Sequence, residues 1–262
     1  MSLVTIEIVD QVAVLRLNNP STLNAMSIEM GTTLHKRLEE AERNARAVLL
    51  TGEGRAFCSG ASLTGGGTLG PSAGTGDFDA GSSLEAHFNP LMLKLRALTV
   101  PFVTAVHGAA AGIGCSIALA GDLIVADQTA YFLQAFRNIG LVPDGGSPYL
   151  LAAAAGRPRA MEAMLLGERI PAETAYNWGM INRLAPEGKD FETGFALAKR
   201  LAEGPRATLA LIRQLAWGAL EKPFAEQLTA EREAQKIAGR TAECREGVTA
   251  FIEKRKARFN TL

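Results

Sequence analysis

Apolar and polar positions along the first fifty residues predict two strands, a helix and a third strand. The segments VTIEIVD and VAVLRLN are β-branched runs separated by Asp10-Gln11, which is typical of a hairpin. Ser27 then precedes apolar or small positions at helical spacing. A short apolar run over residues 47–51 ends before Gly52 and predicts a buried strand.

The same order of elements returns later in the chain. PFVTAVHG predicts a strand, GIGCSIALAG a helix of small residues, and DLIVAD another strand. This alternation indicates a mixed α/β core.

The C-terminal part of the chain has a different pattern. From Arg157 onward the alanine-rich sequence predicts helices almost throughout, and Val248, Phe251 and Ile252 form an apolar stripe on a charged helix, as expected of a helix that docks onto another surface. We therefore expect a core over residues 1–200 and a helical C-terminal region over 201–262.

One segment predicts no regular structure. Residues Thr64–Ser83 are rich in glycine, serine and threonine and hold too few large apolar residues to form a core. We expect a mobile loop, which could be either a lid or an insertion.

Charge and cysteine content narrow the choice of partners. The 262 residues carry 27 basic and 27 acidic side chains, so no net charge favours nucleic acid or an anionic membrane as a partner. The three cysteines form no C-x-x-C pair, which argues against a disulfide framework or a zinc site. No apolar run reaches the ~20 residues of a membrane span. We expect a soluble, cytoplasmic protein.

Several familiar catalytic motifs are incomplete. Gly112-Ile113-Gly114 lacks the third glycine of a dinucleotide fingerprint, because Ile117 stands there. The three glycines at 65–67 are not followed by G-K-[ST], and there is no G-x-S-x-G elbow. A nicotinamide or flavin site, a P-loop and a serine hydrolase are therefore disfavoured.

The three histidines do not form a metal-binding pattern. His35, His87 and His107 lack H-E-x-x-H spacing, so we predict no metal site. His87 precedes Phe88-Asn89-Pro90 beside the predicted loop, where it could act as an auxiliary acid or base.

Two glycine-containing corners carry more information. GRAFCSGASL leads from a strand into a Gly-Ala-Ser corner, and HGAAAGIGCSIAL turns into a helix whose first N–H groups have no acceptor within that helix. Two such donors aimed at one point would bind an oxyanion. The alternative is that both corners only allow close packing.

These corners, with LNNPSTLNAM before them and EGVTAFIEKRKARF at the end, resemble the enoyl-CoA hydratase/isomerase (crotonase) family over nearly the whole chain. The resemblance implies a spiral of repeated ββα units whose helical C-terminal region mediates trimerisation. It also implies a homotrimer or a dimer of trimers. The substrate would be an acyl-CoA thioester, with coenzyme A as part of the substrate and no permanently bound cofactor.

The resemblance also assigns residues. The backbone N–H groups of Ala61 and Ile113 would form the oxyanion hole that stabilises a thioester enolate. Five further residues would contact coenzyme A: Ala25, Ser62, Leu63, Phe251 and Lys254. Of these, Phe251 and Lys254 would face the nucleotide of an adjacent subunit. Ser62 stands where the family usually has aspartate.

The chain departs from the family's hydratases at both of their catalytic glutamates, where it has Ser116 and Phe136. Asp144, in GLVPDGGSP, could be an ordinary turn residue. The resemblance is closest to the branch that isomerises the ring epoxide of phenylacetyl-CoA and shifts double bonds in unsaturated acyl-CoAs. In that branch a single acid/base acts at this position, which implies this role for Asp144. Leu141 and Val142 are expected to raise its pKa if it is buried.

The sequence thus predicts an acyl-CoA isomerase. Alternatives are a hydratase that uses other groups, a dehalogenase in which Asp144 attacks an aromatic ring to form a covalent aspartyl ester, and a catalytically silent acyl-CoA binder or assembly protein.

Overall fold

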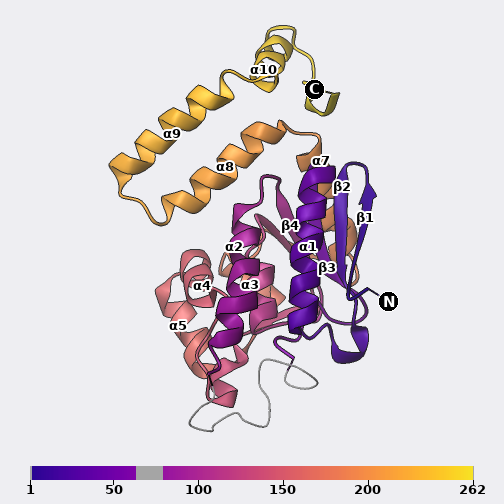
Figure 1. Ribbon diagram of the computed structural model, residues 1–262, viewed down its shortest axis with the longest axis vertical. Helices are drawn as coiled ribbons and strands as arrows, with labels where there is room; N and C mark the ends of the chain where they lie inside the picture. Colours follow the sequence, from indigo (N-terminus) through magenta and orange to yellow (C-terminus); the bar gives the residue numbers. More distant parts are fainter. Residues whose placement is uncertain (1, 63–78, 262) are drawn as a thin grey trace.

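The computed structural model describes residues 2–62 and 79–261, and its strands form two sheets (Figure 1). The larger sheet has the order β1-β2-β3-β4-β6-β9, and the smaller has β5-β7-β8. Only the pairs β1–β2 and β7–β8 are antiparallel within these sheets. The strands of the larger sheet are β1 (Val4–Val9), β2 (Val12–Leu17), β3 (Ala47–Gly52), β4 (Phe102–Val106), β6 (Leu123–Asp127) and β9 (Arg183–Ala185).

The chain alternates between the two sheets and then adds a helix. After β4 it enters β5 (Ala109–Ala111) and α3 (Ile113–Leu119). After β6 it enters β7 (Tyr131–Leu133), which is followed by further helices: η3 (Ala135–Ile139), α4 (Ser147–Ala155) and α5 (Arg157–Leu166). The expected repetition of two strands and a helix is therefore present.

Helices cover both faces of the larger sheet, because successive side chains of a strand point to opposite faces. On one face, α1 (Ile28–Asn44) and α2 (Asn89–Ala97) pack over Leu15, Val48 and Leu50. On the other, α7 (Asp190–Ala202) packs over Val14 and Leu49. This double coverage explains why every residue of β3 is buried.

The N-terminal predictions are confirmed, including the start of the first helix. Ser27 is the N-cap of α1, and its Oγ accepts a hydrogen bond from the Met30 N–H at 3.1 Å. The prediction of an almost wholly helical chain after Arg157 is wrong in two places, because β8 (Arg169–Pro171) and β9 complete the two sheets around the short α6 (Ala172–Asn177). Both strands have only three residues, too few for a period-two pattern to be recognised.

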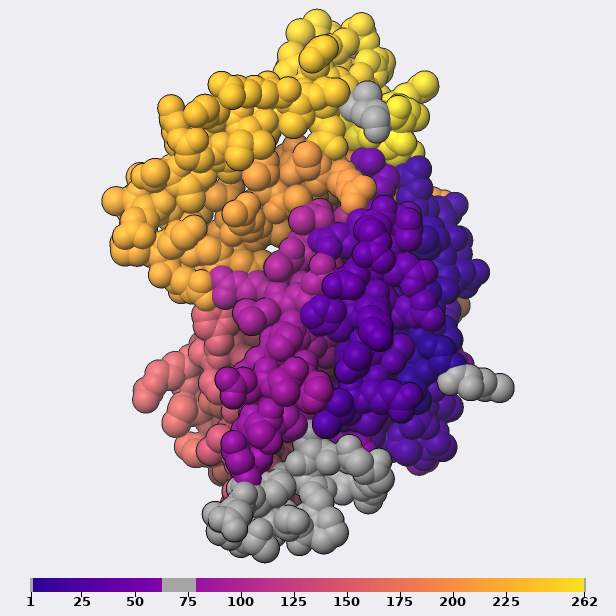
Figure 2. All heavy atoms as spheres, viewed as in Figure 1, coloured from indigo at the N-terminus to yellow at the C-terminus, as the bar shows by residue number. Residues whose placement is uncertain are grey.

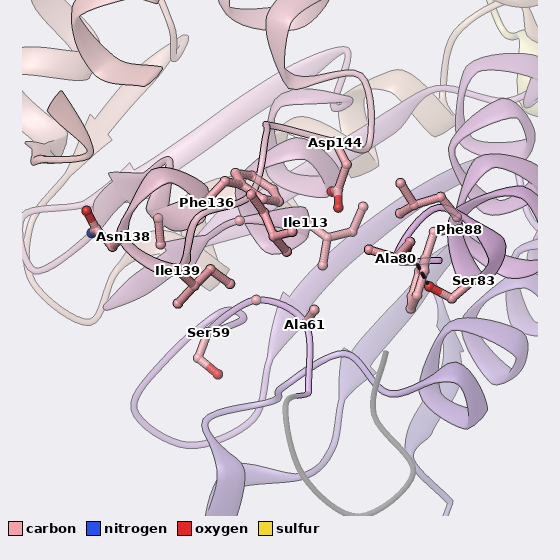
Figure 3. A pocket seen from close by; sticks show the side chains of 15 residues that line it. Ser59, Ala61, Ala80, Ser83, Phe88, Ile113, Phe136, Asn138, Ile139 and Asp144 are labelled. Carbon is pink, nitrogen blue, oxygen red and sulfur yellow. Dashed lines mark hydrogen bonds between the residues drawn. The ribbon is translucent and has the colours of Figure 1, made fainter. Parts of the chain in front are cut away.

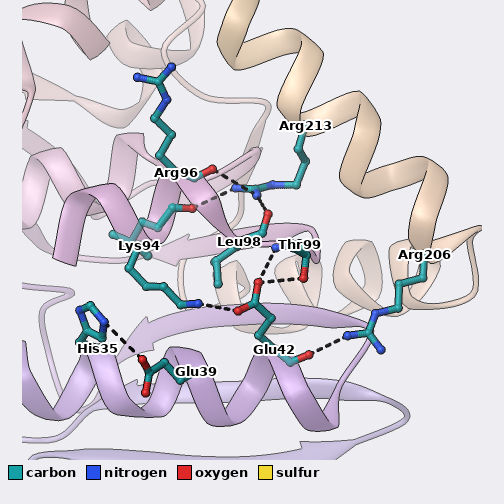
Figure 4. A network of polar contacts seen from close by, with 10 residues as sticks. His35, Glu39, Glu42, Lys94, Arg96, Leu98, Thr99, Arg206 and Arg213 are labelled. Carbon is teal, nitrogen blue, oxygen red and sulfur yellow. Dashed lines mark hydrogen bonds and ion pairs between the residues drawn. The ribbon is translucent and has the colours of Figure 1, made fainter. Parts of the chain in front are cut away.

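The C-terminal helices form an outer layer at one end of the molecule (Figure 2). They are α8 (Arg206–Ala219), α9 (Phe224–Ala238) and α10 (Ala242–Ile252), followed by the short turn η4 (Phe259–Thr261). Arg213 joins α8 to the core, since its buried guanidinium pairs with Asp122 and donates to the carbonyl of Leu95. It also donates to the Leu98 carbonyl (Figure 4). Arg206 adds a bond to the Glu42 carbonyl at 2.7 Å.

Residues 2–62 and 79–261 contain neither a candidate membrane span nor a candidate metal-binding cluster. No helix in these ranges is long and apolar enough to cross a membrane. Nor do they contain a group of three or more His, Cys, Asp and Glu side chains placed to hold a metal ion.

Candidate active site

Two chain segments run side by side into the two glycine corners. Cys58 N–H donates to the Ala109 carbonyl, and Ala111 N–H donates to the Cys58 carbonyl, both at 2.9 Å. This short parallel pairing lies beside β5 and brings Gly60 and Gly112 to the same place. The corners that the sequence suggested separately are therefore neighbours.

Both corners need glycine. Gly60 has φ +107° and Gly112 has φ +51°, conformations that residues with a Cβ rarely adopt. A methyl group added to Gly60 would lie 3.1 Å from the Ala111 carbonyl oxygen. The two turns are thus fixed by close backbone packing.

The residue after each glycine has an unused N–H. Around Ala61, Met26 N–H donates to the Gly60 carbonyl at 2.7 Å and Ser62 N–H donates to the Met26 carbonyl at 3.0 Å, which leaves the N–H of Ala61 itself outside this pairing. Ile113 is the first residue of α3, where N–H groups have no acceptor inside the helix. Within the described part of the chain, neither N–H donates a hydrogen bond.

Ala61 and Ile113 line one cavity of about 180 Å³, together with Asp144 (Figure 3). Its walls are mainly apolar and come from the two corners, the segment before α2, and η3 with the turn that follows it. The other described lining residues are Ser59, Gly60, Ala80, Ser83, Leu84, Phe88, Gly112, Ala135, Phe136, Asn138, Ile139 and Leu141. The predicted oxyanion donors and the predicted acid therefore meet at one site.

The Asp144 carboxyl group points into this cavity. Burial raises the pKa of Asp144 to about 6, because the charged form loses hydration. Its Oδ1 oxygen is buried and accepts no hydrogen bond from the residues described here. Such a carboxyl group is suited to act as a base near neutral pH.

The source of this burial differs in part from the expectation. Leu141 lines the cavity, but Val142 is 80% exposed and does not shield the carboxyl group, so that part of the prediction is wrong. Ile113 and Phe136 supply apolar wall instead.

Neither position at which the family resemblance implies a hydratase glutamate holds an acid. Phe136 is only 7% exposed and forms part of the wall. Ser116 is fully buried in α3, where its Oγ lies 2.6 Å from the Ser147 Oγ. Among the described lining residues, Asp144 is the one titratable side chain.

The predicted coenzyme-binding residues fall into separate groups. Ala25 and Ser62 flank the pairing of Met26 with the Ala61 corner. Leu63 lies outside the described residues. Phe251 lies in the last turn of α10 and Lys254 two residues after that helix, and neither lines the cavity; the Phe251 side chain is 85% exposed.

His87 does not reach the cavity. It belongs to the π-helical turn η2 (Leu84–Phe88) and faces a surface recess beside His35, whereas Leu84 and Phe88 of the same turn line the cavity. The sequence pointed to His87 and gave no sign of Leu84 and Phe88. No repeating pattern shows which face of such a short, irregular helix is directed to the core.

Comparison with known proteins matches one family over most of the chain. A model of the enoyl-CoA hydratase/isomerase family matches residues 7–261. The 1,2-epoxyphenylacetyl-CoA isomerase of Escherichia coli is 41% identical, over 95% of this chain and 94% of its own. A Rhodobacter capsulatus protein named probable enoyl-CoA hydratase is 40% identical, over 97% and 96%.

Solved structures show the same architecture. The crystal structure of an enoyl-CoA hydratase from a Polaromonas species superimposes with a TM-score of 0.91 at 32% identity, over 97% of this chain and 98% of the other. The chain therefore has the crotonase fold and belongs to the enoyl-CoA hydratase/isomerase family.

Proposed function

We propose that the protein is an acyl-CoA isomerase in which Asp144 moves one proton while the Ala61 and Ile113 N–H groups hold the thioester oxygen. The observation that carries this proposal is that a single carboxyl group with a raised pKa faces the same cavity as two unused backbone donors.

One carboxyl group is sufficient for a double-bond shift. With a 3-enoyl-CoA, the Asp144 carboxylate takes a proton from C2, and the electron pair delocalises into a dienolate whose negative charge rests on the thioester oxygen. The protonated carboxyl group then returns the proton to C4. The C=C bond moves from C3–C4 to C2–C3, with no net gain or loss of atoms.

Two backbone donors match the charge that this reaction develops. Donors that are fixed before the reaction stabilise an oxyanion without reorganising, and one donor is typically worth ~10²–10³ in rate. The packing of Gly60 against Ala111 supports such a fixed geometry.

A hydratase is the main competing function, since relatives of 41% and 40% identity carry isomerase and hydratase names respectively. Hydration requires an acid/base pair that places and splits a water molecule. Ser116 and Phe136 provide no such pair, and the walls of the cavity are mainly apolar. These features favour an isomerisation that needs no water.

We also propose that the protein works as a homotrimer or a dimer of trimers. Neither Phe251 in α10 nor Lys254, two residues after that helix, lines the cavity of its own chain, which leaves them available to face coenzyme A in an adjacent subunit. The exposed apolar residues Phe224 and Ile252, at 78% and 72%, support an assembly that covers these helices.

The test is to assay purified protein with three substrates: a 3-enoyl-CoA, a 2-enoyl-CoA and the ring 1,2-epoxide of phenylacetyl-CoA. Asp144→Asn is the test variant, because it keeps the shape of the side chain and removes the base. Asp10→Asn is the control, because it changes an exposed aspartate in the β1–β2 turn.

The proposal expects conjugated thioester from the 3-enoyl-CoA or a rearranged ring from the epoxide, with the wild type and Asp10→Asn but not with Asp144→Asn. Full activity of Asp144→Asn would overturn the role of Asp144. Turnover of the 2-enoyl-CoA alone, with loss of its conjugation, would establish the hydratase instead.

A further inference from the structure

Within residues 2–62 and 79–261, the Asp144 carboxyl group makes no hydrogen bond or ion pair that would fix its direction. Its Oδ1 oxygen is buried without a hydrogen-bond partner among the described residues. The direction of the side chain therefore depends on the apolar walls around it and on the backbone that carries it.

That backbone is held by two buried hydroxyl groups. Ser147 Oγ donates to the Asp144 carbonyl at 2.8 Å, and Ser116 Oγ lies 2.6 Å from Ser147 Oγ and 3.2 Å from the same carbonyl. Since each hydroxyl has one proton, a consistent arrangement is a relay in which Ser116 donates to Ser147 and Ser147 donates to Asp144. Both serines are 0% exposed.

The turn that follows Asp144 sits directly on α3. Ser147 N–H donates to the Asp144 carbonyl at 3.0 Å, closing a turn in which Gly145 and Gly146 have φ +59° and +79°. A methyl group added to Gly145 would lie 2.3 Å from Ile113 Cδ1 and 3.1 Å from Ser116 Cβ. The turn therefore rests against the helical turn that carries the second oxyanion donor.

We infer that Ser116 and Ser147 are positioning residues that hold the Asp144 backbone against α3 and thereby aim the carboxyl group at the carbon next to the thioester. The inference rests on the proposed function. It also gives a physical reason for a small polar residue at position 116. The Ser116 hydroxyl hydrogen-bonds within the Asp144–Ser147 turn, and that turn occupies the space that a longer side chain would need.

The groups around Asp144 make a pH readout possible. The elements packed against it contribute Ile113 and Ser116 from α3, Phe136 from η3 and Phe88 from the end of η2, none of which is charged. An acidic limb in the pH profile of kcat/KM would thus report Asp144 itself.

The experiment compares Ser116→Ala, Ser147→Ala and the double variant in the 3-enoyl-CoA assay. Thr104→Val is the matched control. Thr104 Oγ1 is also a buried hydroxyl, and it donates to the Ala118 carbonyl of α3 at 2.9 Å, but Thr104 does not line the cavity. Melting temperatures and circular dichroism establish that each variant is folded. Asp144→Asn is measured in parallel.

We expect kcat to fall about tenfold to a hundredfold in each serine variant, with KM within about twofold, because a misplaced catalytic group costs rate more than binding. The double variant should lose little more than the worse single variant, since the two hydroxyls act as one relay. The acidic limb should move to lower pH as water reaches the loosened carboxyl group. Thr104→Val should keep both kcat and the pH profile.

Serine variants with wild-type kcat and an unmoved acidic limb, or losses that Thr104→Val reproduces, would overturn the inference. An inactive Asp144→Asn beside unaffected serine variants would remove the inference and leave the proposed function standing. An active Asp144→Asn would remove both.

Discussion

A methyl group added to Gly112 would lie 3.7 Å from the Cα atom of Gly60, so the two glycine corners are direct neighbours. Each corner is followed by one of the unused N–H groups that line the cavity. The positions of the two donors therefore depend on the positive φ angles of both glycines and on the close approach of Gly60 to the Ala111 carbonyl oxygen, at 3.1 Å from an added methyl group.

Replacement of Gly60 by alanine should disturb this contact. The new Cβ would have to accept φ +107° and a 3.1 Å approach to the Ala111 carbonyl oxygen, so the turn would shift and carry the Ala61 N–H with it. We expect kcat for isomerisation to fall by about 10²–10³, the value of one oxyanion donor. Steady-state kinetics of the folded variant measure this.

Gly188→Ala is the matched control. Gly188 also has a positive φ, +70°, but it lies between β9 and α7, where a methyl group added to it would have nothing within 4 Å. The substitution should lower stability by about 1 kcal/mol and leave kcat unchanged. Equal rates for Gly60→Ala and the wild type would show that the corner does not position a catalytic donor.

The rate of isomerisation should depend on pH through Asp144. The carboxylate is the active base, and its pKa is raised to about 6 by burial. We therefore expect kcat/KM for a 3-enoyl-CoA to be constant above about pH 7 and to fall tenfold per pH unit well below about pH 6. An acidic limb near pH 4 would mean that the carboxyl group is fully hydrated in the working enzyme.

The free energy of unfolding should also depend on Asp144, but it should fall as pH rises, whereas the rate of isomerisation increases. The pKa of Asp144 rises from 3.8 to about 6 on folding, so the folded chain binds more protons, and the stabilisation present below about pH 4 is lost as pH rises through 6. Because the side chain is partly exposed, we expect about 1–2 kcal/mol, less than the full shift implies. Asp144→Asn should be more stable than the wild type by that amount at pH 8.

Urea unfolding of the two proteins at several pH values measures this difference. It should shrink as pH is lowered from 8 to 5. A difference that stays constant with pH would come from packing of the amide and would contradict the electrostatic explanation.

Removal of the Arg213 side chain should loosen the C-terminal layer. Asp122 is buried enough that its pKa is raised in spite of Arg213, so Arg213→Met would leave a buried carboxyl group without its cation. We expect a loss of about 3–5 kcal/mol and faster proteolysis within α8–α10. Adding Asp122→Asn to this variant should restore part of the lost free energy of unfolding. Lys256→Ala removes an exposed ion pair and should change that free energy little.

The sequence was sufficient for elements whose signals are local. The hairpin, the Ser27 cap and the buried strand at 47–52 follow from patterns within a few residues. The three-residue strands β8 and β9 could not be predicted in this way, because they form only when distant strands offer an edge.

The candidate site was predictable in chemistry and less so in geometry. Asp144, Ala61 and Ile113 line one cavity as the family resemblance implied. The outward direction of His87 and Val142, and the bonds from Ser147 to the Asp144 carbonyl, depend on how an irregular helix and a glycine turn pack on α3. No short-range pattern encodes that packing.

The apolar surroundings of Asp144 have a consequence for isotopes. A carboxyl group that is shielded by Ile113, Phe136 and Leu141 exchanges its proton with solvent slowly while substrate fills the cavity. The hydrogen that leaves C2 of the acyl chain would then be the same one that arrives at C4. In heavy water, a large share of the first-turnover product would remain unlabelled, and the enzyme would relocate a hydrogen without admitting one from the medium.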